Sequence, residues 1–143
     1  MKVTHSSDCC TLNIPNKLTE IRYVAEVVDQ LAIEWKFLPK LSKQLNLAIE
    51  EVVSNIIFYA YIDKKEHTIT IEIQNQGKDI CIQVTDDGQC FNLLESGNKV
   101  DINTSIEERK IGGLGIHILK TLVDKIEYAR KGETNVVKLT KKY

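Results

Sequence analysis

The stretch EEVVSN, residues 50–55, decides the fold because it places two carboxylates and an amide inside a long apolar helical pattern. Apolar residues return about every three or four positions, which predicts a helix from about 40 to 62. These residues are Leu41, Leu45, Ala48, Ile49, Val52, Val53, Ile56, Ile57 and Ala60. At about 3.6 residues per turn, Glu51 and Asn55 lie about 40° apart on one edge of the stripe, whereas Glu50 points roughly away.

The chemistry of that helix edge is informative. Residues four apart on a helix are neighbours, so Glu51 and Asn55 can face one cavity. A carboxylate there can take up a proton, and an amide oxygen can ligate a hard cation. Taken alone, however, the segment is better explained as an ordinary solvated helix edge.

The segments around this helix predict a fold of helices and strands, because apolar residues alternate in some of them and return at helical spacing in others. Strands are expected at about 9–14, 69–73, 80–84, 125–129 and 136–140, and further helices at about 21–35 and 114–122. We therefore expect an α+β fold, a two-layer sandwich of one mixed, mostly antiparallel sheet with helices on one face. Residues 1–143 are expected to form a single domain.

Composition and charge exclude several classes of protein. The chain is 43% hydrophobic and 27% charged, which is typical of a folded globular domain rather than a disordered tail. Its formal net charge of -1 gives no field that gathers nucleic acid or anionic lipid, so we expect no direct nucleic-acid or membrane partner. The four cysteines match neither a zinc site nor a disulfide framework. We expect a cytoplasmic protein with reduced thiols.

The segment DDGQCF, residues 86–91, follows the apolar alternation of a strand. A carboxylate at a strand end can accept a hydrogen bond from the exocyclic amine of a base, and a nearby glycine lets a flat base approach the backbone. Asp86 and Gly88 are therefore candidates for an adenine pocket. Taken alone, they are better explained as part of a type I turn.

The segment GGLGIHI, residues 112–118, begins the helix expected at 114–122. Glycines at a helix start expose backbone N–H groups and make an anion site suited to phosphates. The segment is neither a Walker loop nor a dinucleotide-binding fingerprint, and a flexible start of the helix is the alternative. Residues 91–111 before it are polar and aperiodic, so we expect a mobile lid there. The role of Arg109 and Lys110 stays open.

In this order, the three segments resemble the N, G1 and G2 boxes of the GHKL ATPase superfamily. Within it, the chain is similar over nearly its whole length to the stand-alone anti-sigma-factor serine kinases of the RsbW and SpoIIAB type. Two positions depart from the usual pattern, with Cys90 where a second glycine is common and Tyr59 where a histidine is common. The residues that match the boxes are Glu51 and Asn55, Asp86 and Gly88, and Gly112, Gly113, Leu114 and Gly115.

This resemblance implies a Bergerat-type ATP site, with an open sheet behind it and a lid between the second and third boxes. In such a site Glu51 acts as general base and Asn55 holds Mg²⁺. Asp86 binds the adenine amine beside Gly88, and the glycine box cradles the phosphates. The closing stretch GETNVV, residues 132–137, resembles the start of the superfamily's last strand and implies a place near adenine for Thr134.

The resemblance also implies a function. The chain is expected to be an ATP-binding anti-sigma factor and serine/threonine protein kinase that phosphorylates a STAS-domain anti-sigma-factor antagonist. Its implied partners are a sigma factor, that antagonist and a second copy of the chain in a homodimer. The alternative is a nucleotide-dependent regulator that binds its partner without kinase activity.

Overall fold

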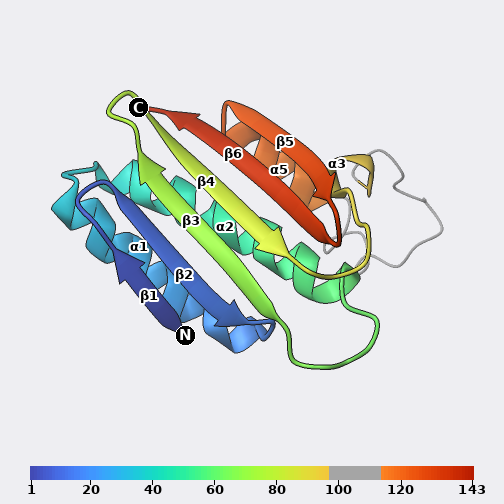
Figure 1. Ribbon diagram of the computed structural model, residues 1–143. Helices are drawn as coiled ribbons and strands as arrows, with labels where there is room; N and C mark the ends of the chain where they lie inside the picture. The colour runs from blue at the N-terminus through green and yellow to red at the C-terminus, as the bar shows by residue number, and fades with distance from the viewer. Residues whose placement is uncertain (97–113) are drawn as a thin grey trace.

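The computed structural model describes residues 1–96 and 114–143, which form one six-stranded sheet and one layer of helices (Figure 1). The strands are β1 (Lys2–His5), β2 (Cys9–Pro15), β3 (Thr68–Asn75), β4 (Asp79–Asp86), β5 (Lys125–Lys131) and β6 (Thr134–Lys142). The helices are the 3-10 turn η1 (Leu18–Glu20), α1 (Ile21–Glu34), α2 (Pro39–Tyr59), α3 (Leu93–Ser96) and α5 (Leu114–Leu122).

The strands lie in the order β1-β2-β3-β4-β6-β5, and each described neighbouring pair is antiparallel. Their register aligns the buried side chains in rows across the sheet. One row consists of Leu12, Ile71, Val84 and Val137, each at most 1% exposed. Since side chains alternate between the two faces of a strand, this row places the core on one face only.

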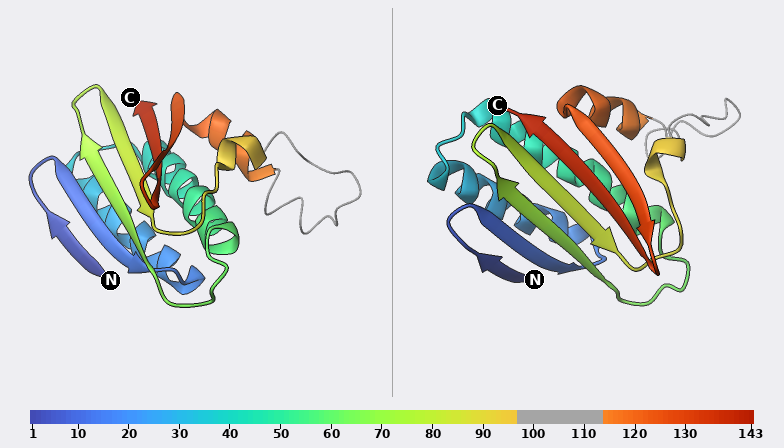
Figure 2. Two further views of the ribbon diagram at one scale, coloured as in Figure 1. Left: turned by 45° about the vertical axis from the view of Figure 1, so that its right-hand side comes forward. Right: turned by 45° about the horizontal axis from the view of Figure 1, so that its top comes forward.

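The helices cover that face, as the two further views in Figure 2 show. Helix α2 lies between α1 and α5, and it contacts both (Figure 1). Pro39 occupies its first turn, where a missing N–H costs nothing. Its apolar stripe is buried against the sheet, with Val52 and Val53 fully inaccessible. Because the apolar face of α2 is buried, the polar edge beside it, with Glu51 and Asn55, also lies at least partly in the interior.

The predicted α+β fold, one sheet with helices on one face, is confirmed, although all described strand pairs are antiparallel and the sheet is not mixed. There are also two additions. Strand β1 was not expected, and the short helix α3 begins within the segment predicted as a lid. The rest of that predicted lid, from residue 97 onwards, lies outside the described residues. Among the helices of the described part of the chain, none is long and apolar enough to cross a membrane.

Candidate functional site

The polar edge of α2 is built as the helical geometry predicted. Asn55 is 1% exposed and Glu51 is half-buried, whereas Glu50 faces solvent. The Asn55 side-chain amide donates to the backbone carbonyl of Glu51 at 2.6 Å, which leaves its Oδ1 buried without a partner among the described residues. Burial raises the pKa of Glu51 above its usual range, and the neighbouring charge of Glu50 adds to the rise.

The start of α5 meets this edge of α2. A methyl group added at Gly115 would overlap the carboxylate of Glu51 and lie 3.6 Å from the amide nitrogen of Asn55. Only glycine leaves that carboxylate its present position, so the first and third predicted segments come together in space. Gly112 and Gly113 lie outside the described residues, and Leu114 is described only as the first residue of α5.

The second predicted segment, at the end of β4, packs against the end of α2. A methyl group added at Gly88 would lie 2.5 Å from the carbonyl oxygen of Ala60, so glycine is required for this close approach. The same carbonyl accepts a hydrogen bond from the backbone N–H of Gln89 at 2.8 Å. Asp86, just before this contact, is 2% exposed.

The two carboxylate oxygens of Asp86 differ in their surroundings. Oδ1 accepts hydrogen bonds at 2.9 Å from the backbone N–H of Gly88 and from the side-chain amide of Asn135. Oδ2 is buried and has no partner among the described residues. Burial raises the pKa of Asp86, while the hydrogen bonds from Asn135 and Gly88 oppose that rise.

Asn135 is the site residue that the sequence analysis did not single out. It lies on β6 opposite Asp86 in the strand register and is 1% exposed. The sequence pattern could have identified it. Side chains alternate between the two faces of a strand, so Asn135 lies on the same face as Val137 and Leu139, which are buried.

Thr134, the residue selected instead, has a different partner. Its half-buried side-chain hydroxyl donates to the backbone carbonyl of Lys131 at 2.8 Å, across the turn between β5 and β6. This bond ties the hydroxyl to the turn. Its place near adenine stays a prediction.

Three buried side-chain oxygens have no partner among the described residues: Asn55 Oδ1, Asp86 Oδ2 and the hydroxyl of Tyr61. The first two suit the ligands expected for them. Buried polar atoms in folded proteins nearly always have a partner, so an exception calls for an explanation. Asn55 Oδ1 is a neutral hard oxygen, the type that ligates Mg²⁺. Asp86 Oδ2 is the stronger acceptor when the carboxyl is ionised, and it suits an exocyclic amine.

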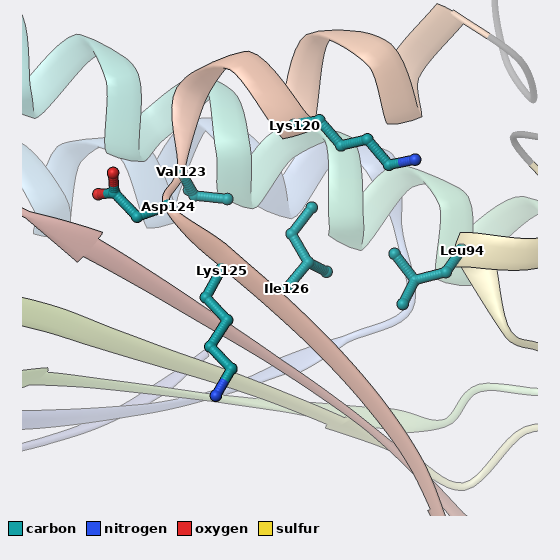
Figure 3. Close-up of a pocket in the computed structure, with 6 residues that line it drawn as sticks. All are labelled: Leu94, Lys120, Val123, Asp124, Lys125 and Ile126. Carbon is teal, nitrogen blue, oxygen red and sulfur yellow. The ribbon is translucent and has the colours of Figure 1, made fainter.

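The described part of the chain has one cavity at the Gly88 turn and another near the end of α5. One of about 340 Å³ borders the outer side of the Gly88 turn and is lined by Ala60, Tyr61, Ile62, Asp63, His67, Asp87, Gly88, Gln89, Arg130 and Glu133. The other, of about 330 Å³, is lined by Leu94, Lys120, Val123, Asp124, Lys125 and Ile126, between the end of α5, the start of β5 and α3 (Figure 3). None of the predicted site residues that the structure describes lines this second cavity.

An ion cluster holds the segment between α2 and β3 against the Gly88 turn. His67 Nε2 lies 2.7 Å from Asp63 Oδ2, and His67 Nδ1 lies 3.2 Å from Asp87 Oδ1. Hydrogen bonds to Asp63 and then Asp87 raise the pKa of His67. Among the described residues, no group of side chains is arranged to hold a metal ion by itself.

Comparisons with known proteins agree with this geometry. The chain is 24% identical over 123 residues to the serine-protein kinase RsbW of Listeria monocytogenes serovar 1/2a, which covers 84% of this chain and 78% of the relative. It is 27% identical over 131 residues to the anti-sigma F factor of Thermoanaerobacter sp. (strain X514), covering 91% of this chain and 90% of the relative. The resemblance predicted from the three segments is confirmed.

A solved structure shares the fold. The crystal structure of the RsbU and RsbW domains of Rv1364c from Mycobacterium tuberculosis matches 92% of this chain with a TM-score of 0.61 and 15% sequence identity. This chain covers 32% of that larger one, and the likeness is one of fold alone. The model of the histidine kinase-like ATPase domain matches residues 14–141, and the chain belongs to that family.

Proposed function

We propose that this chain is an ATP-binding anti-sigma factor and serine/threonine protein kinase that phosphorylates a STAS-domain antagonist. The observation that carries the proposal is the meeting of Glu51 and Asn55 with Gly115 at the start of α5. There a half-buried carboxylate lies beside a buried amide whose oxygen has no partner among the described residues. The names of the two relatives, a serine-protein kinase and an anti-sigma F factor, support the same function.

The proposed site has a base end and a phosphate end. At the base end, Asp86 Oδ2 accepts a hydrogen bond from the adenine amine, and Thr134 lies near the ring. Gly88 lets the turn after β4 pack against the backbone of Ala60 beside Asp86. At the phosphate end, Asn55 Oδ1 ligates the Mg²⁺ that accompanies ATP. The N–H groups of the glycine box, residues 112–115, bind the phosphates at the start of α5.

Glu51 is the proposed general base. The oxygen of the partner's serine or threonine hydroxyl forms a bond to the γ-phosphorus, the bond from that phosphorus to the bridging oxygen breaks, and ADP leaves. The hydroxyl proton passes to the Glu51 carboxylate. Because burial raises the pKa of Glu51, its carboxylate is a stronger base than one on the surface.

The partners follow from the proposed class. A kinase of this type binds a sigma factor in one state and its antagonist in another, and it acts in the cytoplasm as a homodimer. A monomeric mass by light scattering at micromolar concentration would contradict the dimer.

The test of the kinase proposal compares two adjacent carboxylates. Glu51→Gln keeps the size of the side chain and removes the base, while Glu50→Gln makes the same change on the solvent-facing side of α2. We expect Glu51→Gln to bind Mg-ATP but to lose phosphate transfer by about 10²- to 10⁴-fold. Glu50→Gln should stay close to wild type. Radiolabel transfer to the cognate STAS-domain protein, recovered by co-purification, measures both.

Two outcomes would contradict the proposal. Equal transfer by wild type and Glu51→Gln would remove the general-base role. No transfer by wild type to a verified partner, with Mg-ATP binding intact, would assign the chain to the regulators that bind a partner without phosphorylating it.

A further inference from the structure

Asn135 lies at the centre of the hydrogen bonds that surround Asp86. Its side-chain nitrogen donates to Asp86 Oδ1 at 2.9 Å and to the backbone carbonyl of Gln89 at 2.7 Å. Its side-chain oxygen accepts from the backbone N–H of Phe91 at 3.2 Å and from the hydroxyl of Tyr128 at 2.5 Å. One side chain on β6 thus joins the end of β4, the segment after it and β5.

From this geometry we propose that Asn135 is a positioning residue that orients the Asp86 carboxylate and thereby determines the preference of the site for adenine. The inference rests on the proposed ATP site. It adds a residue that acts through Asp86 and does not itself contact the base. The Asn135 amide occupies Oδ1, and the oxygen left for a ligand is Oδ2.

The direction of the Asn135 amide is fixed by partners that cannot exchange roles. The backbone N–H of Phe91 can only donate, so the atom facing it is the Asn135 oxygen. The backbone carbonyl of Gln89 can only accept, so the atom facing it is the Asn135 nitrogen. The N–H group that points at Asp86 is therefore set by the backbone, and the carboxylate cannot turn without breaking it.

The same N–H group favours the ionised form of the carboxylate, against the effect of burial. Burial favours the neutral form of Asp86, and a neutral carboxyl is a poorer acceptor for an amine. Hydrogen bonds from Asn135 and Gly88 stabilise the charged form. The other charged or titratable groups near Asp86 are Asp87, Arg130, Tyr61 and Tyr128. These groups stay the same when Asn135 alone is replaced.

The proposal is tested with two substitutions at one position. Asn135→Asp keeps the shape but replaces the N–H donor with a carboxylate oxygen facing Asp86. Repulsion between two carboxylates this close raises the pKa of one of them, so the pair can share one proton. At pH 8 both are charged, Asp86 is no longer held, and we expect affinity for Mg-ATP to fall by about 10- to 100-fold, as for a lost hydrogen bond to a charged group.

A falling pH separates positioning from a merely structural role. As the pH drops towards 5.5, a shared proton replaces the missing N–H and restores the bond between the two side chains. The affinity deficit of Asn135→Asp relative to wild type should shrink accordingly. Asn135→Ala also loses the donor but cannot share a proton, so its deficit should not shrink. In both variants the preference for Mg-ATP over Mg-GTP should fall.

The matched control is Asn13→Asp, which makes the same change at a half-buried asparagine on the other face of the sheet, where Asn13 accepts a hydrogen bond from Thr70. Calorimetric titrations with Mg-ATP and Mg-GTP at pH 5.5 and pH 8 measure all four proteins. If Asn135→Asp does not fold, Asn135→Ala alone carries the test through its nucleotide preference.

The outcomes distinguish this inference from the proposed function. Wild type that binds no Mg-ATP would overturn both. Wild type that prefers Mg-ATP, with Asn135→Ala showing the same affinity and the same preference, would overturn the role of Asn135 alone. An Asn135→Asp deficit that is equal at both pH values would also overturn it.

Discussion

The two ends of the candidate site are built differently. At the base end, Asp86 is held by the Asn135 amide and the Gly88 N–H, and Gly88 packs directly against the backbone of Ala60. At the phosphate end, the carboxylate of Glu51 lies against Gly115 through the tip of a flexible side chain. Each end keeps one buried carboxylate or amide oxygen without a partner among the described residues.

The difference indicates a division of roles between the two ends of the site. Hydrogen bonds hold the base end in place before any ligand binds, so binding a base there costs little conformational entropy. Among the described residues, the phosphate end has fewer fixed contacts, and we expect a bound ligand to complete its geometry. Substitutions at the first end should therefore disturb the fold, and substitutions at the second should disturb the chemistry.

A matched pair of glycine substitutions tests this division. In Gly115→Ala the added methyl group displaces the Glu51 carboxylate, a flexible group, so we expect phosphate transfer to fall by about 10- to 100-fold. Its stability should hold, since alanine is favoured over glycine in a helix. In Gly88→Ala the methyl group meets the Ala60 backbone, and we expect a loss of about 1–3 kcal/mol in the free energy of unfolding.

Chemical denaturation and radiolabel transfer, measured on the same two proteins, give the comparison. The division is wrong if Gly115→Ala is the less stable of the two, or if Gly88→Ala retains its fold and Gly115→Ala retains its transfer rate.

A smaller effect is expected from the histidine cluster beside the base end. Hydrogen bonds to Asp63 and Asp87 raise the pKa of His67, so protonated His67 stabilises the folded state. That contribution is fully present below the unfolded pKa of about 6.5 and is lost as the pH rises through the raised folded value. The melting temperature of His67→Gln should lie below that of wild type at pH 6, and the gap should close by pH 9.

The control for the histidine variant is His117→Gln, at an exposed position on α5. A gap between wild type and His67→Gln that stays constant with pH would mean that the ring acts by packing on Tyr61, which it stacks against at 4.5 Å, rather than by charge.

Most of the fold follows from local patterns in the sequence. Alternating isoleucines predicted β3 and β4, and helical spacing predicted α2 and α5, because each pattern reports a single buried face. Strand β1 could not be predicted in this way. All four of its residues are exposed, so hydrogen bonding to β2, and not burial, holds it.

The site was predicted less completely, for a different reason. Glu51 and Asn55 were paired correctly because one helix relates them, and helical geometry is regular. Asn135 and Asp86 are 49 residues apart, and only the strand register brings them together. The resemblance to a family covered both Thr134 and Asn135 but gave a role to Thr134 only, while the alternation of buried residues along β6 points to Asn135.

The central claim is that the unpartnered oxygens of Asn55 and Asp86 bind two different parts of Mg-ATP. The direct measurement is a calorimetric titration of wild type, Asn55→Ala and Asp86→Ala with ATP and GTP, each with and without Mg²⁺. Asn55→Ala should lose most of the Mg²⁺ dependence of ATP binding and keep the preference for adenine. Asp86→Ala should lose the preference for ATP over GTP and keep the Mg²⁺ dependence. Titrations of both variants that match those of wild type would contradict the account.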